Sequence, residues 1–305
     1  MPRALALMVV FTLLVVATLM GCSSSATHRD APTPLPEPTA SPPATPAPDS
    51  ASDSIAVPGE RRAEPPQVEC PDDNERRGWY YTPASAAGAV PSIPGDIARL
   101  LDAHAGLWRV DTSEKVVYLT LDQGYEAGYT ATILDTLARE RVPVAFFVTR
   151  SYVENNPDLV RRMVSDGHLI ANHSDTHPSM PGLAGDPAAF EAEFARCAAA
   201  FEALTGERMS PLFRPPMGEY SAQTLCMTER LGYTSVFWSF AHRDWLLDDQ
   251  PPVDVTVERV VRGTHPGAVL LLHSVSSSNT EALPEIIRQL RAEGYRFGRL
   301  DEVVR

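Results

Sequence analysis

Polar residues of the types that perform acid–base chemistry recur along this chain, each directly after a short apolar run. Asp122 ends the run Val-Val-Tyr-Leu-Thr-Leu, and His173 follows Leu-Ile-Ala-Asn. Arg214 closes Leu-Phe, Asp244 follows another apolar stretch, and His273 ends Val-Leu-Leu-Leu. Carboxylates and imidazoles are the side chains that most often transfer protons in enzymes, and an arginine can keep a neighbouring carboxylate charged. Together they suggest a catalytic site.

A second pattern suggests a metal ion. His173 and His177 are four residues apart in His-Ser-Asp-Thr-His. On a helical turn this spacing places both imidazoles on one face, where they can bind a divalent cation. Each polar residue alone has an ordinary explanation, such as a cap or a buried histidine, but their joint occurrence favours one shared site.

The apolar runs alternate with segments of helical periodicity, which predicts an α/β fold. The predicted strands are residues 116–122, 144–149, 169–172, 212–214, 234–240, 269–273 and 296–300. The predicted helices are residues 129–140, 157–166, 188–204, 222–231, 255–261 and 281–293. Such alternation implies parallel strands with right-handed crossovers, in an open sheet or a barrel. Since the carboxyl ends of barrel strands share one rim, we expect the polar residues to converge there.

The N-terminal residues 1–21 resemble a secretion signal. Arg3 precedes an apolar run of roughly 16 residues, shorter than the about 20 that a membrane span needs. The run ends in Leu-Met-Gly-Cys22, which resembles a bacterial lipobox, so we expect Cys22 to be lipidated and to anchor the chain to the membrane. An uncleaved signal anchor is the alternative. Both predict an extracytoplasmic protein.

The next segment, residues 22–66, is rich in Pro, Ala and Ser, and we expect a disordered tether there. One folded domain would occupy residues 67–305. Cys197 and Cys226 fall on predicted helices, where a small buried apolar role is expected. One disulfide among these two and Cys70 stays open. The net charge of −13 argues against binding to nucleic acid, whose phosphates need basic patches, and we expect a monomer without a nucleic-acid partner.

Five ordered motifs resemble those of the polysaccharide deacetylases, the NodB-homology enzymes of carbohydrate esterase family four. They are Thr120-Leu-Asp-Gln-Gly124, His173-Ser-Asp-Thr-His177, Arg214-Pro-Pro-Met-Gly218, Arg243-Asp-Trp245 and Leu270-Leu-Leu-His273. Longer segments at 122–130, 237–245 and 265–273 resemble the delta-lactam-biosynthetic de-N-acetylases. Those enzymes act on N-acetylmuramic acid in peptidoglycan strands stripped of their peptides. The resemblance covers residues 78–305 and implies a distorted (β/α) barrel.

The resemblance also implies a role for each motif residue. Asp122 would be the general base, oriented by Arg214, and His273 the general acid, tuned by Asp244. Met217 and Gly218 would bind the substrate at the oxyanion, and Trp245 and Leu271 would surround its acetyl methyl group. The metal ligands would be His173 and His177, which would hold a divalent metal, with Zn²⁺ as the first candidate.

Two residues depart from the family pattern. Gln123 replaces the second acid of Asp-Asp, normally a metal ligand, which weakens the expected metal affinity. Ala241 stands where the fourth motif usually begins with an acid.

Two alternatives to muramic acid deacetylation remain open. One keeps the chemistry on N-acetylglucosamine in peptidoglycan or chitin-type oligomers, or on O-acetylated xylan. The other is a catalytically inactive, glycan-binding lipoprotein, which only Gln123 favours. The rim segments 151–157 and 178–186, expected as loops, would contact neighbouring sugars.

Overall fold

The structure is a computed structural model, and it describes residues 69–304. The predicted signal at 1–21, the lipidation residue Cys22 and the tether at 22–66 lie outside the described residues. Among residues 69–304, no helix has both the length and the apolar character that crossing a membrane requires.

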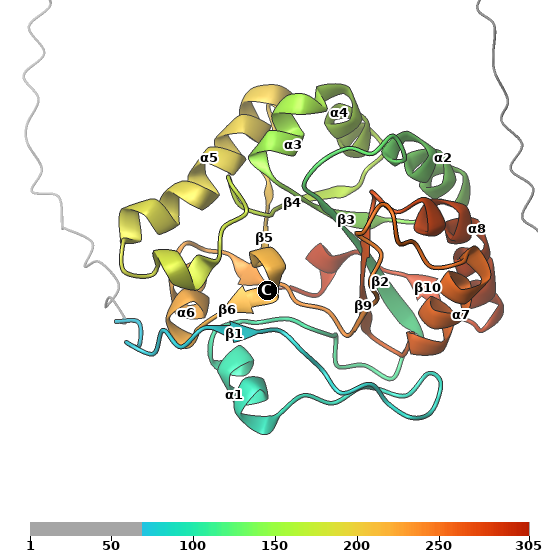
Figure 1. Cartoon of the computed structure of the whole chain (residues 1–305), viewed down its shortest axis with the longest axis horizontal. Helices are drawn as coiled ribbons and strands as arrows, with labels where there is room; N and C mark the ends of the chain where they lie inside the picture. Colours follow the sequence, from blue (N-terminus) through green and yellow to red (C-terminus); the bar gives the residue numbers. More distant parts are fainter. Residues whose placement is uncertain (1–68, 305) are drawn as a thin grey trace, which may run out of the picture. The chain divides into compact units, whose positions relative to one another are not determined.

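A parallel sheet forms the centre of the described part and curls into a half-barrel (Figure 1). Its strands follow the order β7-β5-β4-β3-β2-β9-β8, and β10 pairs with the start of β2. Their bounds are β2 Val116–Gln123, β3 Val144–Val148, β4 Leu169–Asn172, β5 Ser210–Phe213, β7 Thr234–Ser235, β8 Phe240–Ala241, β9 Ala268–His273 and β10 Arg296–Phe297. This arrangement confirms the predicted α/β fold of distorted-barrel type.

Six helices cover the outer face of the sheet, as Figure 1 shows. They are α2 Thr130–Glu140, α3 Arg150–Asn155, α4 Pro157–Ser165, α5 Pro187–Thr205, α7 Val253–Gly263 and α8 Ser277–Ala292. A large apolar core fills the space between these helices and the sheet, and a smaller one fills the inner face. The helices therefore fix the sheet from outside and leave one end of the strands open for chemistry.

The alternation of side chains along β2 decides where its polar end points. Leu119 and Leu121 belong to the outer core, whereas Tyr118 belongs to the inner one. Because successive side chains in a strand face opposite sides, Asp122 lies on the inner face and Gln123 on the outer face. Both side chains are buried.

Three predicted elements are corrected by the structure. The predicted strand 234–240 is two short strands, because β7 pairs with β5 and β8 pairs with β9, at the two edges of the curled sheet. The predicted strand 296–300 ends early and is followed by a 3-10 turn, Leu300–Glu302. The expected loop 151–157 contains most of α3, whose first turn is capped by the Thr149 hydroxyl accepting from the Tyr152 amide.

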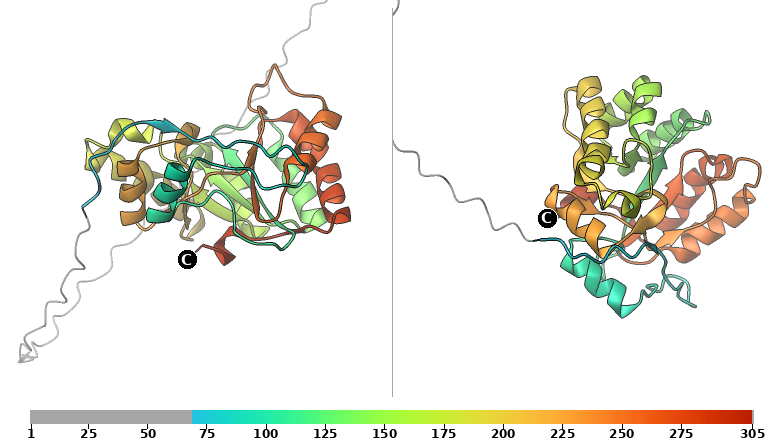
Figure 2. Two further views of the ribbon diagram at one scale, coloured as in Figure 1. Left: turned by 90° about the horizontal axis from the view of Figure 1, so that it is seen from below. Right: turned by 60° about the vertical axis from the view of Figure 1, so that its left-hand side comes forward.

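The N-terminal part of the described chain adds elements that the sequence did not reveal. Strand β1, Arg77–Gly78, pairs antiparallel with β6, Glu219–Tyr220. Helix α1, Gly95–Ala103, lies at the edge of the described part, apart from α2–α5 (Figure 2). The remaining elements are the 3-10 turns Met180–Leu183 and Pro216–Gly218 and the helix α6, Ala222–Arg230.

The cysteines are distributed differently from the expected small buried roles. Cys226 on α6 forms a disulfide with Cys70, 156 residues earlier. The helical position of Cys226 was thus a poor guide, because its sulfur faces the incoming N-terminal segment. Cys197 is free and fully buried, which confirms its expected role as a small apolar side chain. The bridge ties the start of the described chain to the barrel.

Candidate active site

The predicted polar residues meet around one cavity of about 800 Å³ at the carboxyl ends of the strands. Asp122 is the second-last residue of β2, His173 follows β4, Arg214 follows β5 and His273 ends β9. The cavity is lined by Asp122, Gly124, Tyr125, Thr149, Arg150, Ser151, His173, Asp175, Thr176, His177, Pro215, Met217, Gly218, Trp245, His273 and Val275. Another cavity of about 850 Å³ lies against α7 and α8 and contains none of the predicted site residues.

Asp122 and Arg214 form a buried ion pair. The Arg214 Nη1 donates to Asp122 Oδ1 over 2.6 Å, and the guanidinium lies 4.0 Å from the centre of the Phe147 ring. Burial alone would raise the pKa of Asp122, but the charge of Arg214 and the nearby imidazoles outweigh it, so the pKa lies below its ordinary value. Asp122 is therefore ionised at neutral pH, as a general base must be.

His173 and His177 are brought together by a turn and not by a helix. Ser174 and His177 both have positive φ, 73° and 59°, and the His177 amide donates to Ser174 Oγ over 2.8 Å. The predicted helical turn is thus wrong, but the rings of His173 and His177 still meet edge to face at 4.8 Å. The Ser174 amide is held by Asn172 Oδ1, which bends the chain directly after β4.

His173 is set up as a neutral donor of an electron pair. Its Nδ1 lies 2.8 Å from the Arg214 carbonyl oxygen, and its Nε2 lies 3.6 Å from Asp122 Oδ2. Burial lowers the pKa of His173 to about 4. Burial also lowers the pKa of His177. A neutral imidazole with one nitrogen bonded to a carbonyl and the other facing a cavity is the usual form of a metal ligand.

Gln123 supplies no third ligand of the usual kind. Its Nε2 donates to Ser274 Oγ over 2.5 Å, and its buried Oε1 has no hydrogen-bond partner in the part of the chain that the structure describes. Within residues 69–304, no cluster of three His, Cys, Asp or Glu side chains could hold a metal ion. His173 and His177 line the cavity, whereas Gln123 does not, so the site fits a divalent ion that is weakly held by two imidazoles and several waters.

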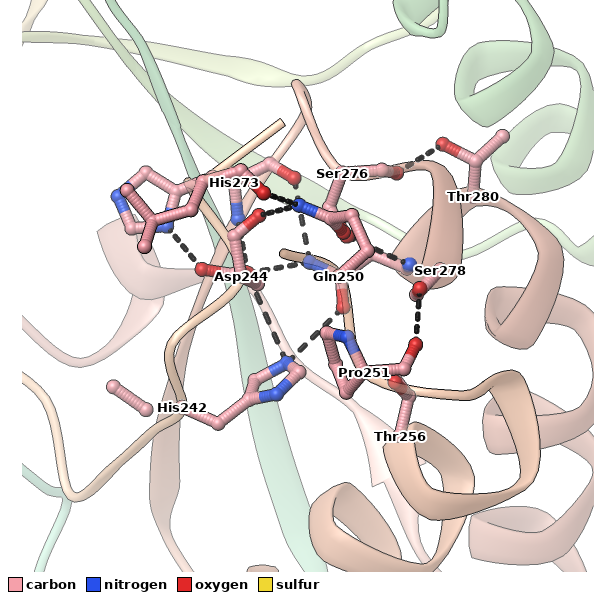
Figure 3. Close-up of polar contacts among 12 residues, drawn as sticks. His242, Asp244, Gln250, Pro251, Thr256, His273, Ser276, Ser278 and Thr280 are labelled. Carbon is pink, nitrogen blue, oxygen red and sulfur yellow. Dashed lines mark hydrogen bonds and ion pairs between the residues drawn. The ribbon is translucent and has the colours of Figure 1, made fainter. Parts of the chain in front are cut away.

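His273 and Asp244 form the second charged pair of the site (Figure 3). His273 Nδ1 lies 2.7 Å from Asp244 Oδ1, and the His273 amide donates to Oδ2 over 2.9 Å. Burial would lower the pKa of His273, but the hydrogen bond and the charge of Asp244 outweigh it and raise the pKa. The Nδ1–H points at Asp244, which leaves Nε2 free for proton transfer.

A polar cluster that the sequence did not predict lies behind this pair. Asn279 Nδ2 donates to Asp244 Oδ2 over 2.5 Å, and His242 Nε2 lies 3.1 Å from Asn279 Oδ1. Figure 3 shows Asp244 between the rings of His273 and His242. Gln250 Nε2 donates to the Asp244 carbonyl, and Ser276 Oγ donates to Gln250 Oε1. The sequence signal was weak, because the run Ser276-Ser-Ser-Asn279 before a helix looks like an ordinary helix cap.

The predicted substrate-binding residues divide into two groups. Met217, Gly218 and Trp245 line the cavity, and the Trp245 ring lies edge to face with His273 at 5.5 Å. Met217 and Gly218 both adopt left-handed backbone, and a side chain on Gly218 would approach Trp238 to 2.8 Å. Leu271 is buried on the inner face of β9 and is not among the lining residues, so its role stays a prediction.

The sequence and the fold are similar to those of known polysaccharide deacetylases. The family model for polysaccharide deacetylase matches residues 109–236. The peptidoglycan-N-acetylmuramic acid deacetylase PdaA of Bacillus subtilis is 37% identical over 231 residues, which are 76% of this chain and 87% of that protein. Its structure superposes with a TM-score of 0.72 at 35% identity, covering 75% of this chain and 97% of the other.

Two other relatives bear on the open alternatives. The peptidoglycan-N-acetylglucosamine deacetylase of Bacillus cereus is 30% identical over 65% of this chain and 92% of its own length. A structure described as a family 4 carbohydrate esterase pseudoenzyme from Bacillus anthracis is 28% identical with a TM-score of 0.60, over 66% of this chain and 69% of the other.

The fold and the paired acid–base groups define a carbohydrate deacetylase of barrel type. This chain belongs to the polysaccharide deacetylase family, carbohydrate esterase family 4, and is a hydrolase acting on carbon–nitrogen bonds. Metal dependence is general in this family.

Proposed function

We propose that this protein removes the acetyl group from N-acetylmuramic acid in peptide-free peptidoglycan strands, the step that permits delta-lactam formation. The observation behind the chemistry is the pairing of Asp122 with Arg214 and of His273 with Asp244 around one cavity. The similarity to the muramic acid deacetylase of Bacillus subtilis supports the choice of sugar.

In the proposed mechanism, Asp122 takes a proton from the attacking water. Arg214 keeps this carboxylate ionised and fixes its direction. His173 and His177 would hold a divalent ion, which when bound polarises the acetyl carbonyl and lowers the pKa of a water. The backbone at Met217 and Gly218 would bind the developing oxyanion.

The leaving amine is protonated from the other side of the cavity. His273 Nε2 donates a proton to the amine as the carbon–nitrogen bond breaks, giving acetate and a free amino sugar. Asp244 accepts the Nδ1–H throughout and stabilises the imidazolium form. Trp245, half exposed beside His273, would cover the acetyl methyl group.

We also infer a place for the enzyme outside the cytoplasmic membrane. The Cys70–Cys226 disulfide supports this, because such bonds persist in oxidising compartments. The wall-acting relatives point the same way. The lipid anchor on Cys22 and the monomeric state are parts of this proposal, and radiolabelled palmitate incorporation that Cys22→Ala abolishes is the expected result for the anchor.

Acetate release tests the function. The purified full-length protein is given peptide-free strands, intact peptidoglycan and chitin oligomers, each with and without Zn²⁺. Release from peptide-free strands alone is expected, with a gain on adding Zn²⁺. Release from chitin oligomers instead would favour the N-acetylglucosamine alternative, which the Bacillus cereus relative supports. No release from any of them, with glycan binding retained, would favour the inactive binding protein, as in the pseudoenzyme relative.

A further inference from the structure

Arg150 is the one lysine or arginine that lines the cavity in the part of the chain that the structure describes. It starts α3, directly after Thr149, and its side chain is 39% exposed. The chain as a whole carries a net charge of −13, so a fixed cation beside the reacting groups is not a general feature of its surface. A cation in this place attracts an anionic group on the substrate.

The backbone holds Arg150 at the same rim as the reacting groups. Its amide donates to the Ser174 carbonyl over 3.2 Å, one residue after His173. The preceding Thr149 hydroxyl lies 3.4 Å from the Gly124 carbonyl, two residues after Asp122. Arg150 therefore lies next to the ends of both β2 and β4.

The side chain is also fixed, but its charge is not cancelled. Its Nε donates to Asp175 Oδ1, a fully buried carboxylate that also accepts from Arg196 Nη1 over 3.3 Å. Two guanidinium groups thus share one carboxylate. Glu154 lies 3.6 Å from Arg150 Nη1 and is half exposed, so this pair is weak and screened by solvent. Arg150 Nη2 makes no hydrogen bond or ion pair within residues 69–304, and Nη1 has only the solvent-screened contact with Glu154, so this edge of the guanidinium can bind a second carboxylate.

Muramic acid has one group that fits this cation. Its lactyl ether is attached to the ring carbon next to the one that bears the acetamido group. The lactyl carboxylate is a free anion only where the peptide has been removed, and it is an amide elsewhere. N-acetylglucosamine has no lactyl group. We propose that Arg150 binds this carboxylate and so selects peptide-free muramic acid, an inference that rests on the proposed function.

A matched pair of substrates tests this inference with the full-length protein. One is the peptide-free strand, and the other is the same strand after its lactyl carboxylates have been converted to methylamides. The second keeps the size of the group, removes its charge and mimics the bond to a peptide. Because hydrogen bonds to charged groups are worth about 1.5–3 kcal/mol, we expect the wild type to prefer the free carboxylate by about tenfold to hundredfold in kcat/KM.

Arg150→Gln supplies the protein side of the comparison. It should reduce kcat/KM on the free carboxylate far more than on the methylamide, chiefly through KM, and so erase most of the preference. Arg196→Gln is the control, because Arg196 also bonds to Asp175 but does not line the cavity. It should leave the preference intact.

Several results would overturn the inference. Equal losses on both substrates, or the same change in Arg196→Gln, would show that Arg150 acts only through Asp175. A wild type that is active but does not prefer the free carboxylate to the methylamide would refute the carboxylate contact and leave the proposed function standing. This comparison uses only the wild-type protein, so it does not depend on whether a variant folds. A wild type that releases no acetate from either strand would refute the proposed function itself, and the inference with it.

Discussion

Asp122 and Asp244 are the carboxylates of the two proposed acid–base pairs, and they differ in what surrounds them. Asp122 lies at a strand end, touches the cavity and is bonded by the guanidinium of Arg214. Asp244 is fully buried in a loop, does not line the cavity and accepts hydrogen bonds from His273 and Asn279. One carboxylate can meet the substrate, whereas the other can act only through an imidazole.

The difference shows how one residue type supplies both a base and a positioning group. A permanent cation holds the pKa of Asp122 low, so its proton-accepting form is the resting form. Around Asp244 the carboxylate raises the pKa of His273, so the proton-donating form of the imidazole is favoured. The two sides therefore push their titrating groups in opposite directions, as a base and an acid in one site require. Substitutions on the two sides should have distinguishable effects.

The largest effect is expected for Asp122→Asn. The amide keeps an acceptor for Arg214 but cannot take a proton from water, so acetate release should fall about 10²- to 10⁴-fold. The loss should be similar on the glycan acetamide and on an activated aryl acetate, because both need the same attacking water. Binding to glycan strands in a pull-down should persist. A variant close to wild type in activity would mean that another group is the base.

A smaller and selective effect is expected for His273→Gln. Loss of the acid should slow acetamide hydrolysis about 10²-fold or more, because the amine cannot leave without a proton. An aryl acetate releases a stabilised phenolate that needs no proton, so its hydrolysis should fall by less than about tenfold. The ratio of the two rates is the measurement. Equal losses on both substrates would contradict the division of labour between the two sides.

A substitution in the polar cluster around Asn279 should also slow acetamide hydrolysis more than aryl acetate hydrolysis, but by less than His273→Gln does. Asn279→Ala removes one of the hydrogen bonds on Asp244, and we expect acetamide hydrolysis to fall about tenfold, with less change on the aryl acetate. Ser278→Ala is the matched control, because its hydroxyl donates to the Pro251 carbonyl over 2.5 Å and not to Asp244. If both variants lose activity equally, Asn279 only stabilises the start of α8.

The sequence allowed prediction of the residues on the Asp122 side better than those on the Asp244 side. Asp122, His173 and Arg214 lie at or directly after strand ends, and the periodicity of apolar residues predicts strands well. Asn279 and His242 could not be found, because their contacts join a loop to a helix that only the folded chain brings together. The turn at His173 and His177 was mistaken for a helical one, since spacing does not report the positive φ of Ser174.

The same limit applies to the fold. The alternation of strands and helices predicted the barrel, but the split of residues 234–240 into β7 and β8 depends on pairing partners at opposite sheet edges. The partner of Cys226 was likewise undecided, because Cys70 lies 156 residues away in a segment without regular periodicity. The local sequence pattern therefore predicts the helices and strands, whereas contacts between residues far apart in the sequence decide where the strands break and which cysteines pair.

The last prediction compares the two ends of β4. His173 follows its carboxyl end, whereas His168 lies before its amino end, packed edge to face against Phe146 at 5.3 Å. Both ring nitrogens of His168 lack a hydrogen-bond partner among residues 69–304, and burial lowers its pKa from the ordinary 6.5 to about 4. The folded protein thus keeps His168 neutral where the unfolded chain would bind a proton. The free energy of unfolding should therefore be highest above pH 6.5 and should fall as the pH drops toward 4.

His168→Phe keeps an aromatic ring against Phe146 and removes the proton site, so this variant isolates the effect. Urea unfolding at pH 7 and pH 5 should show that the wild type loses about 1–2 kcal/mol more than the variant over this interval. Acetate release at pH 7 should not change, because residues at the amino ends of barrel strands serve stability and not catalysis. Equal losses in the two proteins would mean that His168 is already hydrated and titrates as it does in the unfolded chain.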